Sequence, residues 1–144
     1  CIVASRNDAK SFIIALYACC RCILYPGTKF RIGSSTKKQA KLIVSDKILD
    51  ELCEWSKPLK AEIADWSTSE IIFCKFKNGS KITVFVANDN ARGLRSNAIC
   101  REEFRQIDKK IEDSVISPFQ TIRNQPYMLN SYYGEKSCFY KKTR

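Results

Sequence analysis

Eight residues near the N-terminus have the types and spacing of a phosphate-binding loop. Segment 4–11 reads Ala-Ser-Arg-Asn-Asp-Ala-Lys-Ser, with four residues between two small ones and then a Lys-Ser pair. In such a loop, consecutive backbone N–H groups and the N-terminus of the following helix form a nest for an anion. Lys10 would then reach the β- and γ-phosphates of a nucleotide, and the Ser11 hydroxyl would ligate Mg²⁺.

Two features of this segment depart from an ordinary phosphate loop. Alanines, Ala4 and Ala9, stand where glycines are usual. A left-handed backbone at Ala9 would cost about 1–2 kcal/mol because of its methyl group, and Asp8 would add a negative charge beside the phosphates. An alternative therefore stays open, in which the segment is a polar turn between a strand and a helix, with an incidental Lys-Ser pair.

A pair of acids, Glu102 and Glu103, follows the short apolar segment 98–100. A phosphate loop needs an acid at a strand end for Mg²⁺ and a second acid that orients or deprotonates the attacking water. Glu102 is the candidate for the metal and Glu103 the candidate base. The alternative is that both are charges favoured by the dipole of a following helix. Arg101 stands where a buried apolar residue is expected.

The composition restricts the chemistry further. The 144 residues include no His, which excludes Ser-His-Asp and Cys-His nucleophile systems and His-ligated zinc. There are 25 Lys and Arg against 15 Asp and Glu, for a net charge of +10, and the excess is greatest in residues 1–50. A polyanion is the natural partner, but charge alone does not separate nucleotide, nucleic acid and anionic membrane, and a solvated basic face is the simpler alternative.

The composition is that of one globular domain, 44% hydrophobic and 28% charged. No apolar run is long enough to span a bilayer and no signal peptide is recognisable, so we expect an intracellular protein with reduced thiols. Most of the eight Cys lie in apolar runs. Cys19 and Cys22 form a CxxC pair within a predicted helix, which we interpret as small buried side chains and not as a metal or redox pair.

The order of predicted elements favours an α/β fold with a parallel sheet. Residues 1–4 are typical of the end of a buried strand, and the apolar run 12–24 predicts a buried helix. Segment 29–33 predicts a strand, and the Ser-Ser-Thr at 34–36 can cap a second helix. The apolar positions expected on the inner face of that helix are Ala40, Val44, Ile48, Leu52 and Trp55.

The second half predicts a hairpin, a strand and a helix. Residues 58–69 are interpreted as a polar connection, and 71–77 and 81–87 as strands around the Asn-Gly turn at 78–79. A two-residue loop would place Phe73 opposite Val84 and Ile72 opposite Phe85. A polar loop, 88–97, precedes the short strand 98–100. The helix that follows is expected to bury Ile107, Ile111, Val115, Phe119 and Ile122, and the chain from residue 124 is irregular.

Taken together, these segments resemble the ATPase domain of the large terminase subunit of tailed bacteriophages. The similarity runs over nearly the whole chain. It implies a P-loop NTPase fold of the additional-strand, conserved-glutamate type, with a mostly parallel sheet flanked by helices. The segments that carry the resemblance are Ser5-Arg6-x-x-x-Lys10-Ser11, Leu24-Tyr25-Pro26-Gly27, Gln39-Ala40-Lys41, Ala91-Arg92-Gly93-Leu94-Arg95 and Glu102-Glu103-Phe104-Arg105-Gln106-Ile107-Asp108.

The resemblance also implies roles for residues. It assigns Lys10 and Ser11 to phosphate and Mg²⁺, Glu102 to the metal through water, and Glu103 to the activation of water. Arg6 matches an arginine placed on the γ-phosphate. The nucleotide-binding loop then comprises Ser5, Arg6, Asn7, Asp8, Ala9, Lys10 and Ser11, and the candidate trans-acting arginines are Arg92 and Arg95. Besides the two alanines, Glu102 departs from the family pattern, because an Asp is usual there.

The resemblance implies ATP and Mg²⁺ as cofactors, and ATP hydrolysis that drives double-stranded DNA through a portal protein into a procapsid. It implies a homopentameric ring, a small terminase subunit as partner, no membrane, and a location in the cytoplasm of a bacterial host. Residues 1–144 would be part of an ATPase domain, with the adenine-side segment before residue 1, and the coupling motif and the nuclease domain after residue 144. Two alternatives remain, a degenerate P-loop domain that binds nucleic acid without ATP turnover and another DNA-translocating ATPase, such as a helicase.

Overall fold

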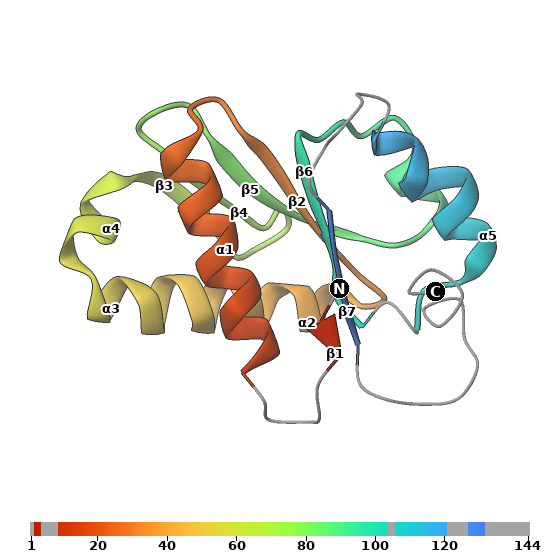
Figure 1. Cartoon of the computed structure of the whole chain (residues 1–144), viewed down its shortest axis with the longest axis horizontal. Helices are drawn as coiled ribbons and strands as arrows, with labels where there is room; N and C mark the ends of the chain where they lie inside the picture. Colours follow the sequence, from red (N-terminus) through yellow and green to blue (C-terminus); the bar gives the residue numbers. More distant parts are fainter. Residues whose placement is uncertain (1, 4–8, 104–105, 121–126, 132–144) are drawn as a thin grey trace.

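The computed structural model describes residues 2–3, 9–103, 106–120 and 127–131 of the chain (Figure 1). Its strands form one sheet with the order β1-β7-β6-β2-β5-β4-β3. The first five strands in this order are parallel, and β4 and β3 extend the sheet in antiparallel fashion. The strands are β1 (Ile2–Val3), β2 (Lys29–Ser34), β3 (Ile63–Ser67), β4 (Phe73–Phe76), β5 (Lys81–Val86), β6 (Ala98–Arg101) and β7 (Tyr127–Ser131).

The topology confirms the expected fold class. Strand β7 lies between β1, which leads toward the predicted phosphate loop, and β6, which ends at the two glutamates. The prediction of an irregular chain from residue 124 is wrong at residues 127–131, which form this inserted strand. Both segments nevertheless end at the same edge of the sheet, because the strands run in parallel.

Helix α1 (Lys10–Leu24) packs one face against the sheet. Its buried side chains are Ile14, Ala15, Ala18, Cys19 and Cys22. The small alanines and cysteines let the helix approach the strands closely. The exposed face of α1 is also apolar and carries Ile13, Leu16, Cys20, Ile23 and Leu24, so the fully buried helix of the sequence prediction has one face open to solvent.

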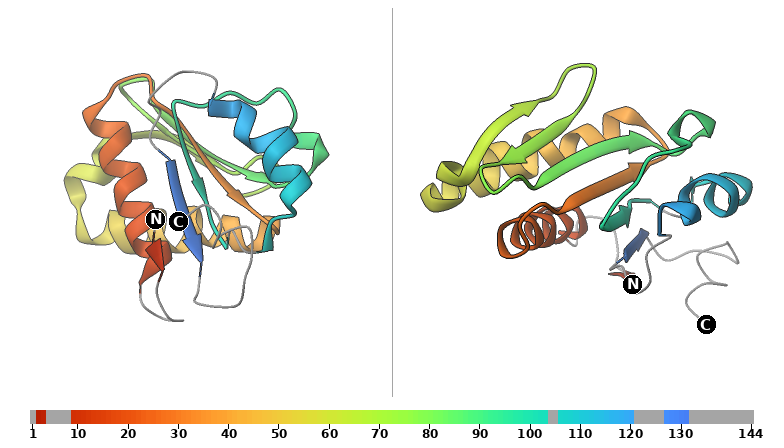
Figure 2. Two further views of the ribbon diagram at one scale, coloured as in Figure 1. Left: turned by 45° about the vertical axis from the view of Figure 1, so that its right-hand side comes forward. Right: turned by 90° about the horizontal axis from the view of Figure 1, so that it is seen from above.

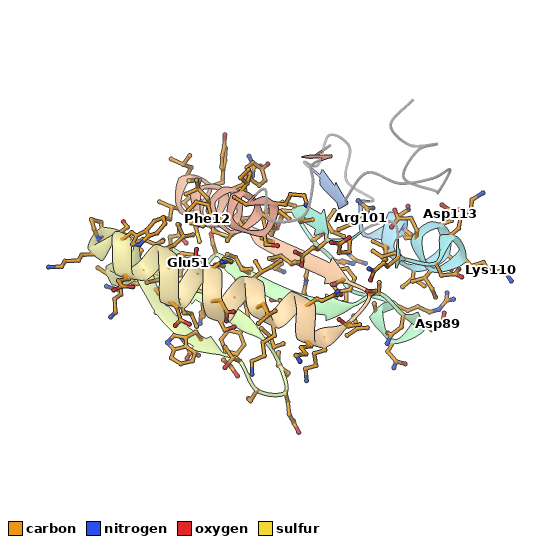
Figure 3. The ribbon with its side chains drawn as sticks, turned by 90° about the horizontal axis from the view of Figure 1, so that it is seen from below. Phe12, Glu51, Asp89, Arg101, Lys110 and Asp113 are labelled. Atoms are coloured by element: carbon orange, nitrogen blue, oxygen red, sulfur yellow. The ribbon has the colours of Figure 1, made fainter. Side chains whose placement is uncertain are left out.

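The second predicted helix is continuous from residue 37 to residue 55, with Thr36 as its N-cap, and lies on the same face of the sheet as α1 (Figure 1). It consists of α2 (Lys37–Leu42), a π-helical segment (Ile43–Leu52) and α3 (Cys53–Trp55). Apolar residues spaced by four face one side because the π-helical turn is wider than an α-helical one. Four of the five positions are buried as expected, but Trp55 is 70% exposed, and its ring lies 5.5 Å from that of Phe12 in a tilted arrangement. Figure 3 shows Phe12 on α1, beside the long helix.

The interpretation of residues 58–69 as a polar connection is wrong. This stretch contains most of α4 (Lys57–Glu62) and all of β3 (Ile63–Ser67). The Ser56 hydroxyl accepts the backbone N–H of Leu59 and caps α4, and Pro58 fits its first turn. As an edge strand, β3 exposes three of its five residues, so it lacks the apolar alternation that predicts a strand.

The hairpin forms where it is predicted, but its register differs by one residue. Phe73 pairs with Thr83 and not with the predicted Val84, and the next pair is Cys74 with Ile82. The N–H of Gly79 donates to the carbonyl of Phe76, and the N–H of Phe76 donates to the carbonyl of Ser80. The connection is therefore a three-residue loop with a bulge, in which Gly79 alone takes the left-handed conformation, at φ 83°.

The last helical segment starts later than predicted and packs on the opposite face of the sheet. It comprises α5 (Lys109–Ile111), a π-helical turn (Glu112–Ile116) and a 3₁₀ turn (Ser117–Gln120), and it lies beside β6, apart from α1 (Figure 2). Asp108 caps it, so Ile107 precedes the helix, although its side chain is buried. Ile122 and the side chain of Phe119 lie outside the described residues.

The two faces of the sheet have separate cores. The larger joins α1 and the long helix to β2, β4 and β5, and the smaller contains Phe85, Ala91, Ile99, Ile107, Val115 and Ile116. Strand β6 serves both, since Ala98 and Cys100 point to the first and Ile99 to the second. This alternation sets the directions of the residues that follow.

Gly33 lets a ring of the smaller core lie directly over β2. A Cβ at this position would lie 2.4 Å from Cζ of Phe85. We expect Gly33→Ala to lower the free energy of unfolding by about 1–3 kcal/mol, because the buried ring must move. Urea denaturation measures this, and Gly33→Ala/Phe85→Leu should recover part of the loss. Wild-type stability of the single variant would contradict the contact.

The cysteines of the described residues are free thiols. Cys19, Cys22, Cys74 and Cys100 are buried as expected, whereas Cys20 is exposed. Burial raises the pKa of Cys22 to about 12, and that of Cys74 to about 12, which keeps both thiols protonated at neutral pH. None of the described helices is long and apolar enough to cross a bilayer.

Candidate active site

Helix α1 begins at the predicted end of the phosphate loop. Ala9 is its N-cap, with φ 52° and ψ 20°, which is the left-handed conformation that a glycine would adopt without strain. The carbonyl of Ala9 accepts the N–H of Ile13 at 2.9 Å and starts the helix. The chain thus carries the cost of about 1–2 kcal/mol anticipated for this alanine. Ala4, Ser5, Arg6, Asn7 and Asp8 lie outside the described residues.

Glu102 connects the end of β6 to the first turn of α1. Its N–H donates to the carbonyl of Gly33 at 2.8 Å, which continues the pairing of β6 with β2. The alternation of β6 turns its side chain toward α1, where the Ser11 hydroxyl donates to Oε1 at 2.6 Å. The two residues predicted to share a metal ion, 91 positions apart in the sequence, are in direct contact.

The Glu102 carboxylate is held at an electrostatic cost. The residue is 6% exposed, and Oε2 has no hydrogen-bond partner among the described residues. Burial raises the pKa of Glu102 above its ordinary value, and the charge of Glu103 raises it further. The hydrogen bond from Ser11 and the charge of Lys10 act in the opposite direction. A buried carboxylate with a free oxygen is the environment in which a cation stabilises the charged form.

Glu103 has an unusual backbone conformation. Its φ is 46°, and it and Ala9 are the two non-glycine residues with positive φ among the described residues. The N–H of Gln106 donates to the carbonyl of Glu103 at 2.8 Å. Left-handed backbone costs about 1–3 kcal/mol at such a side chain and is concentrated at functional sites. The buried Oε2 of Glu103 also lacks a hydrogen-bond partner within the described part of the chain.

This geometry weakens the alternative explanation of the two glutamates. Helix α5 begins at Lys109, and its N-cap is Asp108, whose carboxylate accepts the N–H of Lys110 at 2.7 Å. Glu102 and Glu103 both precede this N-cap and lie outside the first turn of α5, to which the effect of the helix dipole is confined. Interaction with the dipole of α5 therefore does not account for the positions of Glu102 and Glu103.

A cavity of about 230 Å³ adjoins the two carboxylates. The residues that line it are Ser11, Gln39, Leu42, Ile43, Asp46, Lys47, Glu102 and Glu103. Asp46 and Lys47 come from the π-helical segment, and no sequence pattern singles them out, because charges on a helix are usually solvated. Lys47 forms an ion pair with Glu51 one turn later. The long helix thus contributes polar groups to the same site.

The donor set fits a magnesium ion. Mg²⁺ prefers hard oxygen ligands and commonly uses one or two carboxylates and keeps several waters. The Ser11 hydroxyl and the Glu102 carboxylate are such ligands, they lie 2.6 Å apart, and the second carboxylate oxygen is available among the described residues. A larger cavity, of about 560 Å³, lies between the long helix, α4 and β3 and contains none of the predicted site residues.

Arg101 occupies a strand position where a buried apolar residue is expected, and its charge is paired with that of a buried glutamate. It points to the face opposite Glu102, and its Nε donates to Oε2 of Glu112 at 2.9 Å (Figure 3). Both side chains are at most 2% exposed. The Ser117 hydroxyl donates to the other oxygen of Glu112 at 3.1 Å. The ion pair ties the end of β6 to the helical segment behind it.

The two arginines of the 88–97 loop do not approach the carboxylates. The loop precedes β6, whereas Glu102 and Glu103 follow it, so the strand separates the two groups. Arg92 donates to Asp89 at 2.8 Å on the surface. Both Arg92 and Arg95 line a cleft of about 500 Å³ beside Ser114, Val115 and Pro118. Within one chain, the structure brings together Lys10, Ser11, Glu102 and Glu103 but not the arginines.

No protein-family model and no curated protein matches the sequence. Several solved structures do match the fold. The ATPase domain of the large terminase of Thermus phage P74-26 matches 93% of the chain with a TM-score of 0.72 and 17% identity, and the chain covers 59% of that structure. The bacteriophage HK97 large terminase matches 90% of the chain with a TM-score of 0.73 and 14% identity, and 28% of it is covered.

A third match is the large terminase of a thermophilic bacteriophage in complex with ATP-γ-S, with a TM-score of 0.64 and 10% identity over 88% of the chain and 30% of that structure. Identities this low show a common fold. The chain therefore has the fold of phage large terminase ATPase domains, as the motifs indicate, and it spans less than two thirds of each of these structures.

Proposed function

We propose that this chain belongs to the ATP-hydrolysing motor of a phage large terminase, which drives double-stranded DNA into a procapsid. One observation carries the proposal, the contact between Ser11 at the start of α1 and Glu102 at the end of β6. The fold supports it, since the similar structures include terminase ATPase domains and a terminase in complex with ATP-γ-S.

The roles of the four clustered residues follow from their chemistry. Lys10 binds the β- and γ-phosphates, and Ser11 and Glu102 hold Mg²⁺, directly or through water. The ion, when bound, neutralises charge that develops on the phosphates. Glu103 accepts a proton from the attacking water and orients it toward the γ-phosphate. A left-handed backbone and the hydrogen bond from the N–H of Gln106 to its carbonyl fix the start of its side chain.

The remaining site residues are assigned in the same proposal. Residues 5–9 supply backbone N–H groups to the phosphates, and Arg6 contacts the γ-phosphate. Arg92 and Arg95 act on the nucleotide of a neighbouring subunit, because β6 separates them from the carboxylates of their own chain. This assignment implies a homo-oligomeric ring, for which we propose a pentamer docked on the portal protein in the cytoplasm of the bacterial host, with the small terminase subunit as partner.

Residues 1–144 are proposed to be part of a longer ATPase domain, with the nuclease domain outside this chain. A second candidate is a degenerate P-loop domain that binds nucleic acid without turnover. The left-handed alanine at the helix start favours it, because this conformation is strained in an alanine at a position where a phosphate loop usually has a glycine. Nucleotide binding separates the two candidates.

Lys10→Ala tests the proposal in the full-length protein. We expect wild-type protein to bind Mg²⁺–ATP and to hydrolyse it faster with duplex DNA, and Lys10→Ala to lose at least about 10-fold in affinity because it removes a phosphate contact. Isothermal calorimetry measures the affinity. The matched control is Lys37→Ala, on the exposed side of α2, which should bind as wild type does. If wild-type protein gave no binding heat, the degenerate P-loop candidate would replace the motor.

A further inference from the structure

A row of three lysines crosses the sheet. Lys29 on β2 pairs with Lys81 on β5, and Lys81 pairs in turn with Lys75 on β4. Neighbouring strands lie about 4.8 Å apart, and paired residues point to the same side of a sheet. The three side chains therefore leave the sheet from positions in line on one face, perpendicular to the strands.

This face is the one away from α1 and the long helix, on the same side of the sheet as α5 and the smaller core. The neighbours of the lysines along the strands, Phe30, Cys74 and Ile82, are buried in the core beneath α1 and the long helix. Because side chains alternate along a strand, the lysines point in the opposite direction. Lys29 and Lys75 are exposed and Lys81 is half-buried.

Two arginines extend the row into a cleft of about 380 Å³. The cleft is lined by Lys29, Arg31, Lys81, Thr83 and Arg95, together with residues 79, 93 and 94, and none of these is acidic. Arg31 follows Lys29 on the same face and donates from Nε to the carbonyl of Arg95 at 3.4 Å. Lys81 also lies 4.0 Å from the ring centroid of Phe73, and Asp65 pairs with Lys75 at the far end of the row.

Like charges on directly paired strand positions destabilise a sheet, so a row of this kind is expected where an anionic partner neutralises it. The cleft lies at the amino ends of β2 and β5, about 20 Å from the carboxyl edge where Glu102 and Glu103 lie, the length of a six-residue strand. A nucleotide bound at the candidate active site of the same chain is therefore not the partner.

We infer that this face, with Lys29, Lys75 and Lys81 as its centre, binds the phosphate backbone of double-stranded DNA. The inference rests on the proposed function, which supplies double-stranded DNA as the polyanion. The position of the binding site comes from the lysine row itself. A row of long, flexible lysine side chains can contact several successive phosphates of one backbone. Because phosphates carry no sequence information, the binding is expected to be independent of base sequence and strongly dependent on salt.

The test compares two triple variants that remove the same charge. Lys29→Gln/Lys75→Gln/Lys81→Gln changes the row, and Lys37→Gln/Lys38→Gln/Lys41→Gln changes the long helix. Fluorescence anisotropy with a labelled duplex, at several salt concentrations, measures affinity in the full-length protein. We expect the row variant to bind at least about 10-fold more weakly at low salt and to lose about two to three from the slope of log affinity against log salt, and the helix variant to change much less.

Further arms keep the result independent of folding and of ATP. Lys29→Arg/Lys75→Arg/Lys81→Arg keeps the charge and should restore affinity, and thermal melting should show each variant folded. Mg²⁺–ATP affinity should be the same in the row variant as in wild-type protein. If wild-type protein bound DNA through the row but did not bind Mg²⁺–ATP, the motor proposal would fail and the DNA-binding inference would stand. Equal losses in the two glutamine triples, or none in the row triple, would overturn the inference. The inference would also be overturned if the row variant bound DNA as wild type does and lowered ATP hydrolysis only in oligomers mixed with wild-type subunits. That result would indicate that the row contacts the nucleotide of a neighbouring subunit.

Discussion

Replacing Glu103 with glutamine is expected to lower the rate of DNA-stimulated ATP hydrolysis by about 10²-fold or more while Mg²⁺–ATP affinity stays within a few-fold of wild type. The amide has nearly the same shape as the carboxylate but cannot accept the proton of the attacking water. Because Ser11 contacts Glu102 and not Glu103, the metal ligands keep their hydrogen bond. Steady-state hydrolysis with duplex DNA measures the rate, and calorimetry measures the affinity.

Two comparison variants make this result specific. Glu102→Gln removes the charge that would hold the metal ion, so it should weaken Mg²⁺–ATP binding as well as turnover. Glu54→Gln, on the exposed side of α3, should match wild type in both. A Glu103→Gln protein that hydrolyses ATP at the wild-type rate would show that Glu103 is not the base, whatever the nucleotide affinity.

Arg101→Met is expected to lower the free energy of unfolding by about 3–5 kcal/mol, because it leaves a buried carboxylate without its guanidinium. Glu112 is wholly buried, and its Oε2 accepts the hydrogen bond from Nε of Arg101 at 2.9 Å. Urea denaturation followed by circular dichroism measures the effect.

The chain contains its own control for this prediction. Arg92 and Asp89 form an ion pair at 2.8 Å, close to the 2.9 Å of the buried pair, but their side chains are 61% and 69% exposed. Arg92→Met should cost less than about 1 kcal/mol. The double variant Arg101→Met/Glu112→Met should regain much of the loss, since apolar replacement of both partners is often neutral. Equal effects of the two single arginine variants would contradict the role of burial.

Local patterns in the sequence predict most of the helices and strands up to residue 101 and assign Ser11 and Glu102 to one site. The long apolar run before residue 24, the Asn-Gly turn and the acids after a short apolar strand each have a physical reason that acts over a few residues. Once the sheet is parallel, its carboxyl edge brings separate strand ends together. That step needs topology only, and no side-chain detail.

Sequence-based prediction fails where a distant contact decides the structure. Arg101 is unexpected in its strand because Glu112 is in another element, and nothing local indicates the pair. Strand β3 is held by pairing with β4 and not by its own apolar pattern. The hairpin register depends on whether one or two residues take positive φ, and Asn78 allows either. The lysine row has no signal in the sequence because it exists only across three strands.

The position of β7 also has a consequence for folding. Ile2 pairs with Asn130, which joins the two ends of the described chain. Pairings of such long sequence separation pay the largest loop-closure entropy and form late. During synthesis, β2 and β5 can pair well before β7 exists, whereas β1 acquires its partner only after residue 131 has been made. Strand β1 is therefore joined to the sheet after α1 and the strands on which α1 packs are already in place.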